Sequence, residues 1–221
     1  MNDEDNARPT QSAADAPAPD KAAEKSPHIP LDVSQSIWER VFTVAPLVLV
    51  GTREEDGSFN LAPKHMAFPL GWGNHFGFVC TPRHSTYQNI RREQAFTVSF
   101  PRPSQILLTS LAAGPRESDC AKPSLKALPM VQAREVEGVL VEDATLCLEC
   151  RLEQIIDGFG DNSIIAGRIL AASAREDALR RAGEDDGQLI FDMSLLAYLH
   201  PGRFAVIEHS HAFPFPEDFQ R

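Results

Sequence analysis

Residues 47–63 read LVLVGTREEDGSFNLAP: an apolar run, a short polar turn and a second, partly apolar run. The first run, Leu47 to Arg53, is typical of a buried strand, and Asp56-Gly57 is typical of a tight hairpin turn. A returning strand is expected to begin at Phe59 and to break at Pro63, because proline has no N–H to donate to a sheet. This stretch therefore predicts an antiparallel hairpin.

Further strands and short helices are expected on both sides of the hairpin, from apolar runs, alternation and helix-capping residues. The expected strands cover residues 47–53, 59–63, 76–80, 95–100, 144–156, 163–174 and 204–208, with an extension near 66–68. The expected helices cover residues 36–44, 85–92, 104–112 and 175–182, and a long loop covers 114–129. About seven strands joined mostly by hairpins indicate a mainly β fold, an antiparallel split barrel with short peripheral helices, and not a doubly wound parallel sheet.

The composition is that of an ordinary folded protein with an acidic surface. Hydrophobic residues make up 43% of the chain and charged residues 24%, and the net charge is −10. A negative field repels nucleic acid and anionic lipid, so neither is expected as a partner. The longest apolar run, Pro46 to Val50, is far shorter than the roughly 20 residues that cross a bilayer. The acidic N-terminus lacks the basic and apolar regions of a signal peptide, so we expect a cytoplasmic protein that no membrane segment anchors.

Residues 1–30 differ in composition from the rest of the chain. They contain seven Ala, five Pro and six acidic residues, but no aromatic residue, Leu or Val. Such a segment buries too little apolar surface to offset the entropy of ordering. We therefore expect a disordered tail over 1–30 and one folded domain over 31–221.

The four cysteines favour reduced thiols over disulfides or a metal site. Cys80, Cys120, Cys147 and Cys150 are too few and too scattered for a disulfide-framed module. Cys147 and Cys150 form a CxxC, but they lie in an expected strand, where residues three apart point to opposite faces. No metal cofactor is expected, and the sequence contains no GxSxG, HExxH or Walker A motif.

Two polar constellations could contact a ligand. Asn60 to Pro63 returns from the hairpin and breaks at the proline, which frees backbone groups and an amide for a ligand. Arg83 to Asn89 places hydroxyls and backbone N–H groups at an expected helix N-terminus, which suits an anion such as a phosphate. Taken singly, the first constellation is more simply a β-bulge and the second more simply a helix cap.

Together these segments resemble the flavin reductase-like family, whose members look like FMN-binding split barrels. The resemblance is carried by Asp56 to Pro63, by His84 to Ile90, and by Leu148-Glu149-Cys150 with the later Asp161 and Gly167. It covers about residues 45–174 and continues more weakly to 215. Family members commonly dimerise with flavin near the interface, so the resemblance implies a homodimer.

The resemblance implies a set of cofactor-binding residues at these positions. Backbone and side chains near the isoalloxazine ring and ribityl chain would come from the hairpin, and the phosphate end would lie at the helix start. The full set is Asn60, Leu61, Ala62, Lys64, His65, Arg83, His84, Ser85, Thr86 and Asn89. Among these, Lys64 and His65 would stabilise negative charge on the reduced ring.

The chain departs from the family pattern at two places. His84 stands where the family has a lysine, so the phosphate charge would have to be met by Arg83 or Lys64. The segment Gly71-Trp72-Gly73-Asn74 replaces the family's Asp-Pro-Pro turn, near where a substrate could enter.

The resemblance implies an FMN-dependent oxidoreductase that takes hydride from NAD(P)H and passes electrons to an acceptor, such as a partner monooxygenase. Because the flavin carries the chemistry, no side chain is expected as a catalytic acid or base. One alternative is a non-enzymatic FMN-binding electron-transfer protein, like a flavoredoxin, without a nicotinamide site. Another is a barrel that has lost its cofactor and serves as an interaction module.

Overall fold

The computed structural model describes residues 27–114 and 122–217 of the chain. A short N-terminal unit ends at Ile37, and the main folded unit begins at Trp38. Nearly all of the expected tail, 1–30, lies outside the described residues, as do Cys120 and part of the expected loop 114–129.

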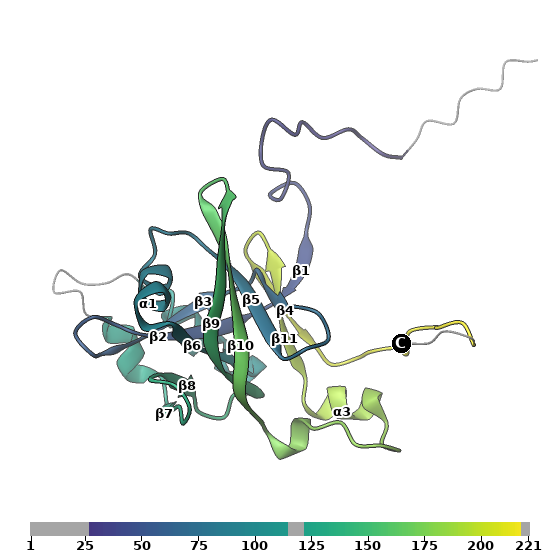
Figure 1. Ribbon diagram of the computed structural model, residues 1–221. Coiled ribbons are helices and arrows are strands. Elements are labelled where there is room, and N and C mark those ends of the chain that lie inside the picture. Colours follow the sequence, from purple (N-terminus) through teal and green to yellow (C-terminus); the bar gives the residue numbers. More distant parts are fainter. Residues whose placement is uncertain (1–26, 115–121, 218–221) are drawn as a thin grey trace, which may run out of the picture. The chain divides into compact units, whose positions relative to one another are not determined.

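The main unit is a mostly β structure whose elements follow one another in short connections (Figure 1). Its strands are β1 Thr43–Pro46, β2 Val48–Arg53, β3 Phe59–Lys64, β4 Ala67–Pro69, β5 His75–Cys80, β6 Ala95–Phe100, β7 Met130–Gln132, β8 Val139–Val141, β9 Leu146–Phe159, β10 Asn162–Ala174, β11 Leu195–His200 and β12 Arg203–Ile207. Its α-helices are α1 Ser85–Glu93, α2 Ile106–Leu111 and α3 Asp186–Asp192, and 3₁₀ turns cover Pro103–Gln105, Pro123–Ala127 and Glu176–Ala178. In the described part, no helix has the length and apolar character needed to cross a membrane.

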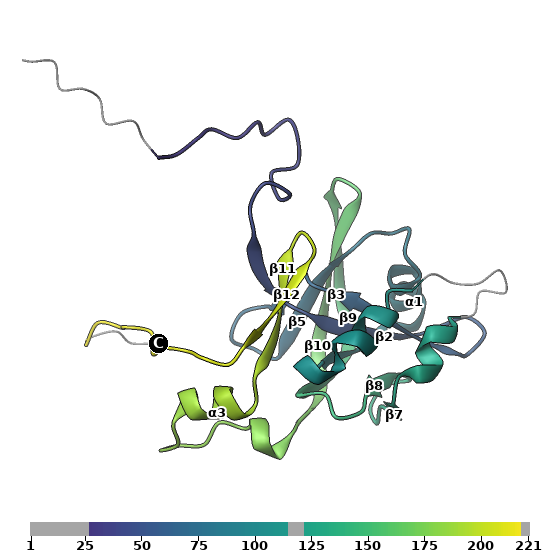
Figure 2. The same cartoon turned by 180° about the vertical axis from the view of Figure 1, so that it is seen from behind.

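One curled antiparallel sheet organises the main unit. Its seven strands lie in the order β3-β2-β6-β9-β10-β5-β4, and every neighbouring pair is antiparallel. A second sheet has the order β1-β11-β12, and β7 and β8 form a separate hairpin. The long β9–β10 hairpin extends past the other strands at one end, and α1 lies to one side of it (Figures 1 and 2). The predicted antiparallel split barrel with short helices is confirmed.

The middle of this sheet is buried on both faces. Val48 and Val50 of β2 pack with Phe78, Phe96 and other apolar residues in one cluster. Leu49, between them in sequence, packs in a second cluster on the opposite face. Successive side chains of a strand point to opposite faces, so one strand contributes to two cores.

The two cysteines of the CxxC follow the same rule. Cys150 belongs to the first cluster and Cys147 to the second, so their sulfurs lie on opposite faces of β9. Burial raises the pKa of both thiols, that of Cys150 to about 12, which keeps them protonated at neutral pH. The prediction that these sulfurs point apart is confirmed, and Cys150 is a core residue as expected.

A buried carboxylate ties the β7–β8 hairpin to the central sheet. Glu149 of β9 is only 6% exposed, and its Oε2 accepts backbone N–H bonds from Arg134 at 2.9 Å, Glu135 at 2.6 Å and Val136 at 3.2 Å. Ser99 of β6 accepts a further bond from the backbone N–H of Val141. Three backbone N–H groups in the turn before β8 therefore share one carboxylate oxygen as their acceptor.

Two sequence-based expectations about helices are wrong. Residues 36–42 form turns and bends, and Thr43–Pro46 pairs with β11 instead of completing a helix over 36–44. Trp38 and Phe42 are more than half exposed, so the apolar side chains of the expected helix do not pack against a core that would stabilise it. From Thr43 onward, pairing with β11 determines the backbone conformation. Between 175 and 182 only one 3₁₀ turn forms, over Glu176–Ala178.

We predict that Glu149→Gln lowers the free energy of unfolding by about 1.5–3 kcal/mol, because three backbone donors lose a charged acceptor. Urea unfolding followed by circular dichroism measures this change. Glu55→Gln is the matched control, since Glu55 is exposed in the hairpin turn. A Glu149 variant as stable as this control would contradict the role given to the carboxylate.

Candidate functional site

Three hollows meet around residues 81–84, the connection between β5 and α1. The strand–helix hollow, about 410 Å³, lies between β3 and the start of α1. The histidine hollow, about 270 Å³, shares Lys64 and His84 with it. The hairpin hollow, about 320 Å³, shares Arg83 with the first and Thr81 with the second, and it lies against the tip of the β9–β10 hairpin.

Seven of the ten predicted cofactor-binding residues line the strand–helix hollow. They come from two segments far apart in the sequence, β3 and the start of α1, which the curled sheet brings together. These residues are Asn60, Ala62, Lys64, Arg83, His84, Ser85 and Thr86. The segment Ala112–Gly114 and Lys122 complete the lining.

The start of α1 presents backbone N–H donors to the strand–helix hollow. His84 is the N-cap residue but makes no side-chain bond to the first turn, and the first turn contains no acidic residue. Thr86, only 2% exposed, lines the hollow from this turn. The N–H groups of the first turn and the positive end of the helix dipole favour an anion here.

The positive charge around this hollow comes from lysine and arginine, not from His84. Burial, together with the charges of Lys64 and Arg83, lowers the pKa of His84, so its ring is neutral at neutral pH. Lys64, Arg83 and Lys122 all line the hollow. These three cations stand around the start of α1, a donor set whose chemistry fits a phosphate group.

Lys122 is a site residue that sequence reasoning missed. Its Nζ donates to the backbone O of Leu61 at 3.0 Å and contacts Asn60 Oδ1 at 3.4 Å. It lies about sixty residues after β3, in the middle of the segment expected as a loop, and no local motif marks it. Only the tertiary fold brings it to the hollow.

Two predicted residues have side chains that do not line the hollow. The Leu61 side chain is fully buried in the second core cluster, and only its backbone O faces Lys122. Asn89 is 2% exposed, its Nδ2 donates to Thr52 Oγ1 at 3.0 Å, and its Oδ1 accepts from Arg92 at 3.1 Å. Asn89 therefore joins α1 to β2.

His65 lies in the neighbouring histidine hollow. Its ring stacks on Tyr198 with centroids 4.3 Å apart, and His200 stacks on its ring at 5.4 Å. Burial, and then the charges of His200 and Lys64, lower the pKa of His65. Protonation of this ring is therefore disfavoured, and His65 is a weaker source of positive charge than Lys64 beside it.

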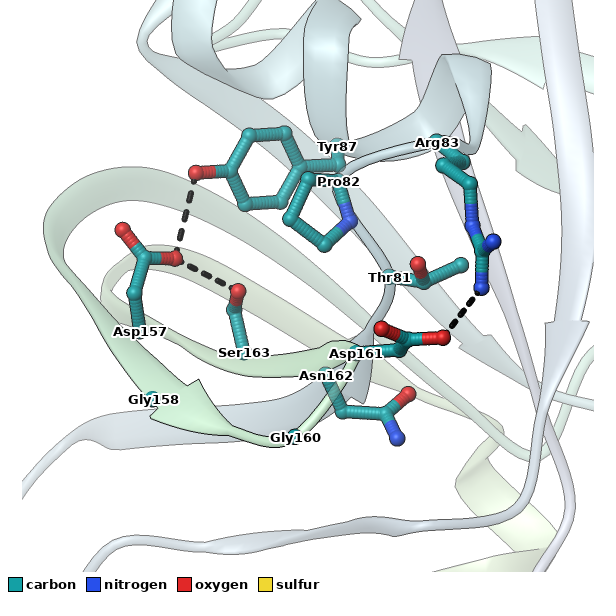
Figure 3. Close-up of a pocket in the computed structure, with 10 residues that line it drawn as sticks. All are labelled: Thr81, Pro82, Arg83, Tyr87, Asp157, Gly158, Gly160, Asp161, Asn162 and Ser163. Atoms are coloured by element: carbon teal, nitrogen blue, oxygen red, sulfur yellow. Dashed lines mark hydrogen bonds and ion pairs between the residues drawn. The ribbon is translucent and has the colours of Figure 1, made fainter.

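The hairpin hollow holds a hydrogen-bonded group that the sequence did not indicate (Figure 3). Asp157 Oδ1 accepts from Ser163 Oγ at 2.5 Å and from the Tyr87 hydroxyl at 3.3 Å. Burial and the adjacent Asp157 charge raise the pKa of Tyr87, which keeps its hydroxyl a donor. On the other side of the hollow, Arg83 pairs with Asp161 at 2.6 Å.

Among the described residues, no group of three or more His, Cys, Asp or Glu side chains is arranged to hold a metal ion.

Comparison with known sequences finds one family. The profile of the flavin reductase like domain matches residues 41–204, about three quarters of the chain.

Solved structures share the fold at low sequence identity. The 2-nitrobenzoate 2-nitroreductase of Pseudomonas fluorescens matches with a TM-score of 0.70 and 19% identity, over 88% of this chain and 98% of its own. The flavoredoxin of Desulfovibrio vulgaris gives 0.68 and 20%, over 83% and 98%. The NADH:FAD oxidoreductase of Streptomyces globisporus gives 0.59 and 14%, over 74% and 86%.

We predict that Asn89→Ala lowers the free energy of unfolding by about 1–3 kcal/mol, because Thr52 and Arg92 lose a buried partner. Urea unfolding monitored by circular dichroism tests this. Arg91→Ala, an exposed position on the same helix, is the control and should stay close to the original stability. If Asn89→Ala matched Arg91→Ala, Asn89 would not be the link between α1 and β2.

Proposed function

Because the chain belongs to the flavin reductase-like family, we propose that it binds FMN and catalyses its reduction by NAD(P)H, with electrons passed to an acceptor or partner protein. The observation that carries this proposal is the strand–helix hollow, where the start of α1 and three cations meet the edge of β3. Flavin mononucleotide has a dianionic phosphate at one end and a planar ring at the other. The cations and N–H groups at the start of α1 suit the phosphate, and the edge of β3 suits the ring.

The phosphate end is assigned to the start of α1. The hydroxyls of Ser85 and Thr86 and the first-turn N–H groups would donate to the phosphate oxygens. Lys64, Arg83 and Lys122 would balance its charge, which supports binding despite the neutral His84.

The ring end is assigned to β3. This strand is at one edge of the seven-stranded sheet, so among the described residues no strand pairs with the backbone groups on its outer side. Lys122 already reaches the Leu61 carbonyl on this side. Asn60, Ala62 and the same backbone edge would hold the polar rim of the ring, while Lys64 would stabilise negative charge there.

A bound flavin supplies the redox chemistry, accepting hydride from a nicotinamide and giving up electrons afterwards. The protein's part is to hold the phosphate, orient the ring and stabilise charge. We assign no side chain as a catalytic acid or base.

We further propose a homodimer with the flavin near the interface and an oxygenase or other electron acceptor as a transient partner. Ile156 and Phe159 on the extended β9–β10 hairpin are 40% and 53% exposed, and Met66 and Phe68 near β4 are 42% and 38% exposed. Apolar side chains in such positions support burial by a second copy.

An absorbance spectrum of the purified protein, recorded before and after anaerobic addition of NADPH and then NADH, tests the proposed activity. We expect flavin bands that bleach with at least one nucleotide. Bands that persist with both would indicate an electron-transfer protein without a nicotinamide site. A protein that shows no flavin bands after incubation with FMN and removal of the unbound FMN by gel filtration would contradict flavin binding altogether.

We predict that Thr86→Val weakens FMN binding about ten-fold, because a phosphate oxygen loses one hydroxyl donor. Its affinity for riboflavin, which lacks the phosphate, should not change. Fluorescence titration measures both constants. Thr109→Val is the control, since Thr109 is 1% exposed on α2 and lies outside the hollow. An equal loss of FMN and riboflavin affinity in Thr86→Val would place the phosphate elsewhere.

A further inference from the structure

Three aromatic side chains join the end of β3 to the second sheet. His65 comes directly after Lys64, the last residue of β3, and its ring centroid lies 4.3 Å from that of Tyr198 and 5.4 Å from that of His200. Tyr198 and His200 are two residues apart on β11, so both side chains lie on the same face of that strand. We call these three side chains, His65, Tyr198 and His200, the ring stack.

The ring stack holds a short bend of the chain. His65 and Met66 form the bend that connects β3 to β4, and they lie outside both strands. One backbone hydrogen bond, from the N–H of Val79 to the O of Met66 at 2.8 Å, attaches the bend to β5 in the seven-stranded sheet. The ring stack attaches it to β11 in the other sheet. The bend is therefore tied to both sheets.

The ring stack contains two buried nitrogen atoms without a partner. Nε2 of His65 and Nδ1 of His200 are buried and have no hydrogen-bond partner among the described residues. Both nitrogens of a protonated imidazole are donors, so protonation of His65 would bury a charged N–H group that has no acceptor. The stacked arrangement therefore favours the neutral ring.

The groups that face His65 also oppose its protonation. These titratable and charged side chains are Lys64, Cys80, His84, Tyr198 and His200. Among the described residues no Asp or Glu lines the histidine hollow, so no carboxylate in it offsets a positive charge on His65. Burial, followed by the charges of His200 and Lys64, lowers the pKa of His65.

These features make the ring stack sensitive to pH. When the stack opens, the His65 imidazole regains the ordinary pKa of about 6.5 and binds a proton more readily. The open state therefore binds more protons than the stacked state. Stacking is favoured above about pH 6.5 and is lost as the pH falls below that value.

We propose that Tyr198 and His200 are positioning residues for the ring end of the flavin site, acting through His65, and that acid opens the ring stack and weakens the hold on the flavin ring. This inference rests on the proposed function, in which β3 and Lys64 hold the ring. Neither Tyr198 nor His200 lines the strand–helix hollow, so their effect on a flavin reaches it through the bend and the end of β3.

Fluorescence titration with riboflavin tests the ring end alone, because riboflavin has no phosphate that a protonated His84 would attract. The original chain should bind riboflavin about two- to ten-fold more weakly at about pH 5.5 than at about pH 7.5, the range expected for loss of one aromatic pair. His65→Phe keeps a ring that cannot be protonated, so its affinity should not change between these pH values. His209→Phe is the matched control, because His209 stacks on Phe191 outside the bend, and it should retain the pH dependence.

Tyr198→Ala removes one ring of the stack. At about pH 7.5 it should weaken riboflavin and FMN by the same factor, about two- to ten-fold, because the phosphate position at α1 is unchanged. Tyr198→Phe keeps the ring and should restore the affinity of the original chain. Phe204→Ala is the control, because Phe204 lies opposite Tyr198 on β12, is 52% exposed and is not part of the ring stack. It should bind both flavins as the original chain does.

Circular dichroism establishes that each variant is folded and gives its thermal midpoint. A riboflavin affinity that is independent of pH in the original chain, or unchanged in Tyr198→Ala, would overturn the positioning role and leave the proposed function intact. A chain that binds no flavin at either pH would overturn the proposed function and the positioning role with it. The thermal midpoint of the flavin-free chain then decides on the ring stack itself. An equal fall with pH in the original chain and in His65→Phe would show that His65 does not make the stack sensitive to pH.

Discussion

The structure depends on three central strands that are buried on both faces. In β2 and β9, alternate residues enter opposite apolar clusters, and several of the largest core residues, such as Leu49, are almost fully buried. In β6, Phe96 and Val98 enter one cluster, while Thr97 and Ser99 bond to β8 on the other face. Any one-residue slip of register would exchange the two sets of side chains, so the pairing is strongly specified. Because these strands cannot shift, the edge strand β3 and the helix α1 are held at fixed positions on either side of the strand–helix hollow.

Polar contacts attach the β7–β8 hairpin and the helix α1 to these central strands. Glu149 fixes the turn before β8, Thr97 and Ser99 bond to β8 itself, and Asn89 joins α1 to β2. Each of these groups is buried, where an unpaired donor or acceptor is costly, so each defines one arrangement of its segment. Asn89 shows that a residue of the family motif can support the site by positioning the helix without facing the ligand.

The sequence was sufficient for elements that carry local signals. The hairpin at Asp56-Gly57, the helix beginning at Ser85 and the long β9–β10 pair were predicted because turn residues and side-chain alternation are local properties. The expected helix over 36–44 failed because its apolar residues have no core to pack against. The strands β7 and β8 were missed because three residues each are too few to show alternation, and β11 was missed because its nearly continuous apolar run, Leu195–His200, does not alternate. The same division holds at the site. The β3 and α1 segments could be predicted as one site only through the family resemblance. The Lys122–Leu61 and Tyr87–Asp157 contacts, by contrast, span 61 and 70 residues of sequence, and no local motif marks them.

The replacement of the family lysine by His84 shifts where positive charge is held. A lysine at the helix start would place its charge directly at the first turn, whereas His84 is neutral and Lys64, Arg83 and Lys122 stand around the hollow instead. Three long side chains place positive charge over a larger part of the hollow than one ammonium group does. Of the three, Arg83 alone also borders the hairpin hollow, and its planar guanidinium can contact two oxygens at once. The departure from the family pattern therefore replaces charge at one helix N-terminus by charge from three parts of the fold: β3, the connection between β5 and α1, and the residue before the 3₁₀ turn at Pro123.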